Sequence, residues 1–166
     1  VIPLFIDQIK SGKSITITDP NMTRFMMTLE DAVDLVLYAF THAKPGDIFV
    51  QKAPATTIEL LATALKELYN ANNEIKVIGT RHGEKLYETL VNREEMTKAI
   101  DMGEYFRIPA DNRSLNYEQY FSVGDTDVSQ IEDYHSHNTN QIGLEETKKL
   151  LLRLEMIQKD LNIVHA

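Results

Sequence analysis

The chain has 166 residues, of which 43% are hydrophobic and 25% are charged, and its formal net charge is -8. This composition is typical of a single globular domain rather than of a disordered chain. The acidic excess argues against DNA or RNA as a partner, because phosphate contacts need concentrated Lys and Arg. The absence of cysteine excludes a disulfide scaffold, a thiol nucleophile and a Cys-based metal site.

No stretch has the features of a membrane span or a secretion signal. No apolar run approaches the ~18 residues of a transmembrane helix, and no basic segment precedes an apolar one as in a signal peptide. We therefore expect a cytoplasmic protein without a membrane span. The first residues carry no initiating Met, so we expect the chain to be a piece of a longer one.

Apolar spacing predicts an α/β chain in which helices and short strands alternate. In the first third we expect a helix over residues 2–9, strands over 14–18 and 24–29, and a helix that begins near Thr28. The buried face of that helix is expected to carry Val33, Val36, Leu37 and Phe40. A short buried strand is expected at residues 48–50.

The rest of the chain continues this alternation and then loses it. Thr56, Thr57 and Glu59 have the spacing of a capping box, which predicts a helix with apolar residues up to Leu68. We expect a strand over 75–78, a helix over 93–100 and a strand over 105–108. One terminal helix is expected to present an apolar face made of Leu150, Leu151, Leu154, Ile157 and Leu161.

Residues 110–143 show neither helical nor strand periodicity and are interpreted as an irregular arm. Its large apolar and aromatic residues need a surface to cover, since exposed ring area is unfavourable; they are Leu115, Tyr117, Tyr120, Phe121, Val123, Ile131 and Tyr134. We expect that surface to belong to a neighbouring subunit of a homo-oligomer. The alternatives are another part of a longer protein, or a lid folded over the chain's own core.

Two polar turns carry the residue types of an anion site. Arg24 follows the turn after the predicted strand 14–18, and Arg81 and Glu84 follow the predicted strand 75–78. Ligands of open α/β sheets gather beyond the carboxyl ends of strands. Two arginines can clamp a diphosphate, and a carboxylate can accept hydrogen bonds from a ribose diol. The alternative is that both arginines are solvated, with Glu84 as an ion-pair partner.

Other chemical signals are weaker or absent. His135 and His137 have no third metal ligand at a recognisable spacing, so we expect no metal site, and His82 is a poor candidate for a general base. The seven glycines form no G-x-G-x-x-G turn or P-loop. No tyrosine is followed four positions later by Lys, so any nicotinamide chemistry must use residues outside this stretch.

Three blocks of the sequence resemble one enzyme family. They are DPNMTRFMMTLEDAVDLVLYAF at residues 19–40, TRHGEKLYETL at residues 80–90, and the tail LNYEQYF with EDYHSHNT and EETKKLLLRL. The chain is similar over essentially its whole length to the C-terminal half of inverting UDP-N-acetylglucosamine 4,6-dehydratases and their relatives described as epimerases. These capsular polysaccharide enzymes belong to the extended short-chain dehydrogenase/reductase superfamily.

The resemblance implies that different parts of the full-length protein have different roles. Residues 1–109 would form an α/β lobe that binds the UDP-amino-sugar, and residues 110–166 a family-specific extension made of the arm and the terminal helix. NADP or NAD would bind the missing N-terminal, Rossmann-type half, which also carries the catalytic residues. Arg24 and Arg81 would contact the diphosphate and Glu84 the uridine ribose, while Val1 and Ile17 would lie against the uracil.

The function implied is that of a UDP-N-acetylglucosamine 4,6-dehydratase that inverts the sugar at C5. A UDP-hexose 4-epimerase would use the same UDP clamp, and a non-catalytic binding or assembly module is the third alternative. This stretch holds no catalytic residue of the family, so we expect the isolated chain to be inactive.

Overall fold

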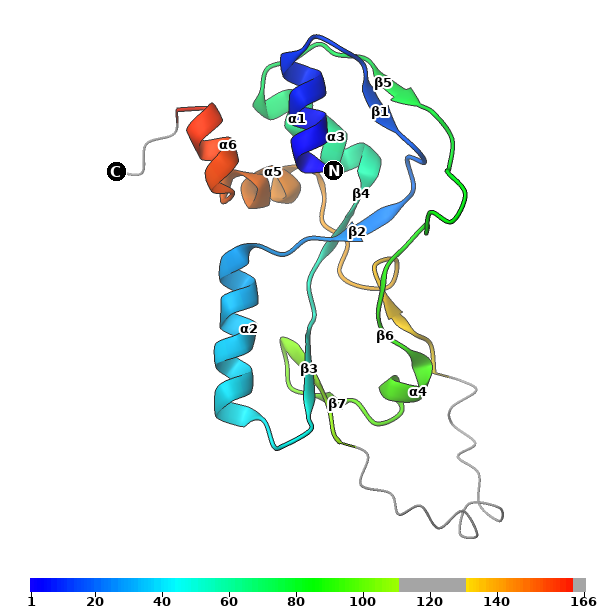
Figure 1. The fold of residues 1–166 in the computed structure, drawn as a ribbon, viewed down its shortest axis with the longest axis vertical. Coiled ribbons are helices and arrows are strands. Elements are labelled where there is room, and N and C mark those ends of the chain that lie inside the picture. Colours follow the sequence, from blue (N-terminus) through cyan, green and yellow to red (C-terminus); the bar gives the residue numbers. More distant parts are fainter. Residues whose placement is uncertain (111–130, 163–166) are drawn as a thin grey trace. The chain divides into compact units, whose positions relative to one another are not determined.

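A computed structural model describes residues 1–110 and 131–162 as two compact units, each formed from separate parts of the chain. Unit 1 contains α1 (Ile2–Lys10), β1 (Ile15–Ile17), β2 (Thr23–Phe25), β4 (Ala55–Thr57), α3 (Ile58–Leu68), β5 (Ile75–Val77), α5 (Leu144–Leu152) and α6 (Glu155–Asp160). Unit 2 contains α2 (Leu29–His42), β3 (Ile48–Gln51), β6 (Thr89–Val91), α4 (Arg93–Met96), β7 (Ile100–Asp101), β8 (Tyr105–Ile108) and β9 (Tyr134–His135). Helices and strands mix in both units (Figure 1), so the predicted α/β class is confirmed.

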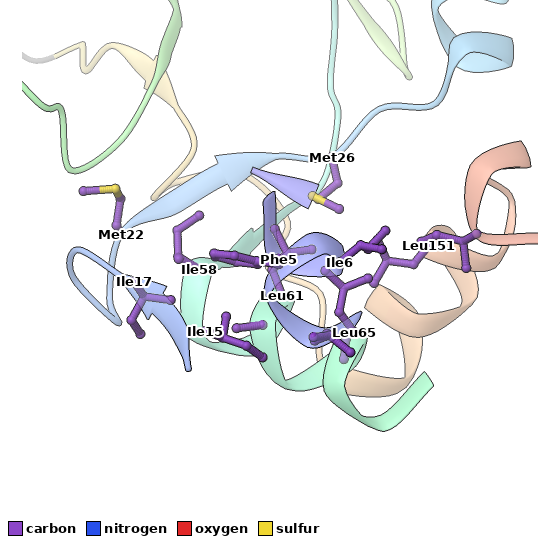
Figure 2. Packing of buried hydrophobic residues seen from close by; sticks show 14 of the residues in the cluster. Phe5, Ile6, Ile15, Ile17, Met22, Met26, Ile58, Leu61, Leu65 and Leu151 are labelled. Carbon is purple, nitrogen blue, oxygen red and sulfur yellow. The ribbon is translucent and has the colours of Figure 1, made fainter. Parts of the chain in front are cut away.

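The core of unit 1 lies between α1, α3, β1 and α5. Figure 2 shows Phe5 and Ile6 of α1 beside Leu61 and Leu65 of α3, with Leu151 of α5 in the same cluster. The exposed fraction of each of these side chains is 4% or less. The helical spacing expected over residues 2–9 and from Ile58 onward is confirmed. Thr57 caps α3 by accepting a hydrogen bond from the Leu60 N–H at 3.1 Å.

Unit 1 has two small sheets whose strands come from distant parts of the chain. β1 and β5 pair in parallel, with Ile17 opposite Val77. β2 and β4 are antiparallel, with Arg24 opposite Thr56. Residues 140–142 extend the second sheet, since the Ala55 N–H donates to Asn140 O and the Ile142 N–H donates to Ala55 O, both at 2.9 Å.

Unit 2 contains an antiparallel sheet in the order β3-β8-β7 and the separate pair β6-β9. An ion pair between Arg107 Nε of β8 and Asp47, 2.7 Å apart, joins two parts of this unit. The hydrogen bond from Arg107, followed by one from the Lys44 N–H, lowers the pKa of Asp47 below its ordinary value. The strand predicted at residues 48–50 exists as β3, but none of its residues is buried, so that part of the prediction is wrong.

The predicted buried face of α2 is also wrong. Val33, Val36, Leu37 and Phe40 are all at least half exposed, and no residue of α2 is buried. The helix instead meets the sheet of unit 2 through Tyr38, whose ring stacks on Tyr105 with centroids 4.3 Å apart. The periodicity identified the helix but not its packed side, which is the side that carries Tyr38.

The later elements depart from the expected pattern in two places. The helix predicted over 93–100 ends at Met96, and Ile100 enters β7 instead. The single terminal helix is broken into α5 and α6 at Leu154, whose extended backbone (ψ 120°) interrupts the helical path. Leu151 of α5 and Ile157 of α6 are each 0% exposed and belong to the same core cluster, so both helices contribute to the core in spite of the break.

The predicted arm is only partly within the described residues. Tyr134 is 8% exposed in β9, where it pairs with Val91 and meets the Phe106 ring at 5.1 Å between centroids. The prediction of an irregular segment is therefore wrong for residues 134–135, which form β9, whereas residues 136–143 contain turns and one isolated bridge at Gln141. Leu115, Tyr117, Tyr120, Phe121 and Val123 lie outside the described residues, so their predicted role and the predicted division at residues 109 and 110 stay predictions.

Candidate functional site

The candidate site forms where the parallel strands β1 and β5 end. Their carboxyl ends meet at one edge of the sheet, and the Ile78 N–H extends the ladder by donating to Ile17 O at 2.8 Å. Parallel strands place the loops that follow them side by side. Thr18 and the loop after Ile78 are brought together in this way, although about sixty positions separate them in the sequence.

The loop after β5 turns back on itself so that Arg81 and Glu84 lie near each other. Gly79 and Gly83 adopt φ angles of +85° and +79°, a left-handed conformation that side chains rarely adopt. The Glu84 carboxylate accepts a hydrogen bond from the Arg81 N–H at 3.2 Å and another from the Thr18 hydroxyl at 3.2 Å. These two contacts fix the carboxylate of an incompletely buried side chain.

Arg24 is held by several contacts at once. Its Nη1 donates to its neighbour's carbonyl, Thr23 O, at 2.7 Å, and its Nη2 donates to Lys85 O at 3.0 Å and lies 3.0 Å from Met22 Sδ. Its Nε lies 3.6 Å from a carboxylate oxygen of Glu88. One N–H of Nη1 is not used by these contacts, and the side chain keeps 23% of its surface exposed.

A pocket of about 160 Å³ unites the predicted site residues. Val1, Ile17, Arg24, Arg81 and Glu84 all line it. Their exposure differs widely: the Val1 side chain is 59% exposed, whereas that of Ile17 is 2% exposed and forms part of the wall. The structure thus brings Arg24 together with Arg81 and Glu84, which the sequence placed in two separate turns.

Other residues of the pocket wall were not predicted from the sequence. Leu4 and Phe5 of α1, Met22 and Ile78 supply apolar surface, and Thr18 supplies the hydroxyl that holds Glu84. The position of Thr18, just after the alternating strand and before the polar turn, is the signal that could have identified it. The apolar residues carried no such signal because each also fits a core position.

The arrangement combines an apolar wall with two guanidinium groups and one restrained carboxylate. A wall of this kind suits the face of a planar ring, and guanidinium groups suit phosphate oxygens. Pockets that enclose a whole drug-sized ligand measure about 300–1,000 Å³. The smaller volume here fits part of such a ligand, with the remainder extending beyond the pocket.

The histidines do not assemble a metal centre within the described part of the chain. No three His, Asp or Glu side chains gather there in a way that could hold a metal ion. The Nδ1 atom of His137 instead lies 2.6 Å from the Thr23 hydroxyl oxygen. His82 is exposed in the loop that carries Arg81 but does not line the pocket. Within residues 1–110 and 131–162, no helix is long and apolar enough to cross a membrane.

Comparison with known proteins gives consistent matches along the chain. Residues 1–110 match the family model described as "Polysaccharide biosynthesis protein", and residues 111–158 match "Polysaccharide biosynthesis protein C-terminal". The chain is 62% identical over 161 residues to proteins named UDP-glucose 4-epimerase from Rickettsia akari (strain Hartford) and Rickettsia rickettsii (strain Sheila Smith). Each match covers 97% of this chain and 47% of the relative.

A solved structure shares the fold. It is described as the X-ray structure of Pen from Bacillus thuringiensis, with a TM-score of 0.72 and 34% sequence identity. The match covers 93% of this chain and 44% of that one. The chain therefore spans less than half the length of each relative named here.

Proposed function

The chain belongs to the polysaccharide biosynthesis protein family, and on that basis we propose that it forms the nucleotide-sugar-binding part of a UDP-sugar-modifying enzyme. The observation that carries the proposal is the pocket in which Arg24, Arg81 and Glu84 meet. A nucleoside diphosphate needs cationic N–H donors for its phosphates and an acceptor for its ribose hydroxyls, and the pocket offers both.

Each pocket residue has a role that its surroundings support. Arg24 donates to the diphosphate through the N–H that its structural contacts leave unused, and the exposed Arg81 closes on the same group. Glu84 accepts from the ribose diol, since its carboxylate is already oriented by Thr18. Val1 and Ile17 supply apolar surface for the uracil ring.

The relatives favour a 4-epimerase as the activity of the full-length protein, because the curated proteins that match are named UDP-glucose 4-epimerase. A UDP-N-acetylglucosamine 4,6-dehydratase is the second candidate, favoured by the resemblance of residues 19–40 and 80–90 to that group. Both reactions need the UDP held while the hexose reaches the reacting groups. In either case the contribution of this chain is orientation of the substrate.

The residues of this chain do not fit a nicotinamide cofactor. Its glycines form no phosphate-binding turn, and it has no Tyr-x-x-x-Lys pair. We propose that NAD or NADP is held by residues present in the longer relatives and not in this stretch, and no catalytic step is assigned to the chain itself.

Calorimetry of the purified chain tests the binding role. We expect UDP to bind more tightly than uridine or inorganic diphosphate, since only UDP engages both the apolar wall and the arginines. Equal affinity for UDP and inorganic diphosphate would contradict a nucleotide site, and an absence of UDP binding would remove the proposal.

A product assay with the full-length protein distinguishes the two activities. Interconversion of UDP-glucose and UDP-galactose identifies the epimerase. Formation of a 4-keto-6-deoxy sugar from UDP-N-acetylglucosamine identifies the dehydratase. A full-length protein that produces neither would contradict both.

A further inference from the structure

Ser136, which lies between two histidines in the sequence, is completely buried. Its exposed fraction is 0%, and it lies just after β9 in the part of the chain matched by the C-terminal family model. Its hydroxyl lies 2.7 Å from the Thr23 hydroxyl and 3.2 Å from Thr23 O, and it accepts a hydrogen bond from the Glu88 N–H at 3.0 Å. Its own N–H donates to Glu88 O at 2.8 Å.

Two of the residues that Ser136 contacts, Thr23 and Glu88, also hold Arg24. Thr23 O accepts from Arg24 Nη1 at 2.7 Å, and the Glu88 carboxylate lies 3.6 Å from Arg24 Nε. Ser136 therefore fixes the carbonyl on one side of the guanidinium and the backbone of its acidic partner on the other. We propose that Ser136 is a positioning residue for Arg24, so that the C-terminal segment completes the nucleotide pocket.

The hydrogen-bond inventory supports one arrangement of this cluster. A hydroxyl has one proton to donate and two lone pairs to accept with. All contacts are satisfied when His137 Nδ1–H donates to the Thr23 hydroxyl, that hydroxyl donates to Ser136 Oγ, and the Ser136 hydroxyl donates to Thr23 O. Ser136 Oγ then uses its second lone pair for the Glu88 N–H.

In this arrangement His137 supports the cluster from its outer side. Its ring also lies against Tyr87, with centroids 4.9 Å apart, which limits the orientations that Nδ1 can adopt. The chain of donors runs from His137 through two buried hydroxyls to the carbonyl that holds Arg24. The two buried hydroxyls at the centre of this chain favour one geometry, because removing either of them leaves a buried polar group without a partner.

The proposed role of Ser136 concerns the same pocket, and its expected effect on UDP binding rests on the proposed function. Whether Ser136 restrains the Arg24 side chain can be tested without a ligand. The Nε–H signal of Arg24 in nuclear magnetic resonance spectra, identified by its loss in Arg24→Lys, reports how firmly the side chain is held. Calorimetry with UDP reports the effect on binding.

The variants separate positioning from general stability. Ser136→Ala removes the central hydroxyl, and Thr23→Val removes the neighbouring hydroxyl while preserving the side-chain shape. Thr139→Val is the matched control, because Thr139 lies in the same segment and its hydroxyl donates to Ala53 O instead. Thr23→Ser restores the hydroxyl and serves as the conservative rescue. Circular dichroism identifies the variants that remain folded.

We expect a rigid Arg24 Nε–H in the wild type and in Thr139→Val and Thr23→Ser, and a mobile one in Ser136→Ala and Thr23→Val. UDP binding should weaken by about tenfold in the two mobile variants, equivalent to about 1.4 kcal/mol. A mobile Arg24 in the wild type, or an unchanged Arg24 in either folded variant that lacks the hydroxyl, would overturn the positioning role. Failure of the wild type to bind UDP, with the Arg24 signals as expected, would overturn the proposed function alone.

Discussion

Arg24 and Arg81 line the same pocket but differ in how they are held. Arg24 is restrained by two backbone carbonyls and faces Glu88, so little side-chain entropy remains to be lost when an anion binds. Arg81 is exposed, and its own N–H, rather than its guanidinium, contacts Glu84. A ligand must therefore order Arg81, whereas Arg24 is already oriented.

Removing either guanidinium tests the anion site. We expect Arg24→Ala and Arg81→Ala each to weaken UDP binding by about 1.5–3 kcal/mol, the range for hydrogen bonds to charged groups. Arg24→Lys should recover little of the loss, because an ammonium cannot reproduce the planar fork of donors. Calorimetry on the purified chain measures all three.

Arg93→Ala is the control for these variants. It removes the same charge from an exposed residue of unit 2 that does not line the pocket, and should leave UDP affinity unchanged. An unchanged UDP affinity in both Arg24→Ala and Arg81→Ala would show that the arginines do not hold the diphosphate. An equal loss in Arg93→Ala would indicate a nonspecific charge effect.

At the scale of elements, the sequence predicted the existence of most helices and strands but was less informative about what they pack against. Periodicity located α1, α3, β1 and β8 because each element matches one simple spacing. The same reasoning failed for α2, where the apolar stripe is exposed and Tyr38 meets the sheet instead. Periodicity records which residues share a face, and burial depends on partners elsewhere in the protein.

The terminal helices show a second limit of the same reasoning. The apolar spacing continues across Leu154, so no local signal marks the break between α5 and α6. The position of α6 is supported by a long-range contact that the sequence pattern does not contain. Asp160 lies 2.6 Å from Lys10 Nζ of α1 and accepts a hydrogen bond from the Tyr69 hydroxyl at 2.7 Å.

This contact predicts a pH-dependent contribution to stability. The hydrogen bond from Lys10, followed by that from Tyr69, lowers the pKa of Asp160 below its ordinary value of about 3.9. A carboxyl with a lowered pKa in the folded state stabilises the fold above its ordinary pKa, and this contribution is lost as the pH falls through the lowered value. We expect Asp160→Asn to lower the melting temperature by a few degrees at pH 7 and to match the wild type near pH 2.

Thermal melts between pH 2 and pH 7 measure the effect of Asp160→Asn. The control is Glu155→Gln, which breaks an ion pair with Lys159 within α6, where both side chains are more than 70% exposed. Exposed pairs of this kind contribute little, so its melting temperature should hardly change. A constant difference between Asp160→Asn and the wild type at every pH would contradict the assignment to ionisation.

At the scale of the whole molecule, the sequence located the residues that line one pocket more readily than the contacts that support them. Arg24, Arg81 and Glu84 could be identified because polar turns after strands have a simple sequence signature. Ser136 could not, because a lone serine in a stretch without periodicity gives no signal, and its importance comes from contacts with Thr23 and Glu88 far away in the sequence. Local patterns locate the loops, and only the fold reveals what supports them.

The chain as it stands is expected to bind a nucleotide sugar without converting it. It spans 47% of the UDP-glucose 4-epimerases that it matches and lacks both a glycine-rich phosphate turn and a Tyr-x-x-x-Lys pair. We expect the purified 166-residue chain to bind UDP and to form no product from UDP-glucose or UDP-N-acetylglucosamine, with or without added NAD or NADP. Chromatography of the nucleotide sugars against a heat-treated sample measures this.

The full-length Rickettsia akari relative is a suitable comparison, because it is named a UDP-glucose 4-epimerase and shares 62% of its residues with this chain over the matched region. Its activity under the same conditions would show that the assay detects turnover. Product formed by the chain alone, above the heat-treated sample, would place catalytic residues within this stretch. Orientation of the substrate would then be only part of what the pocket around Arg24 does.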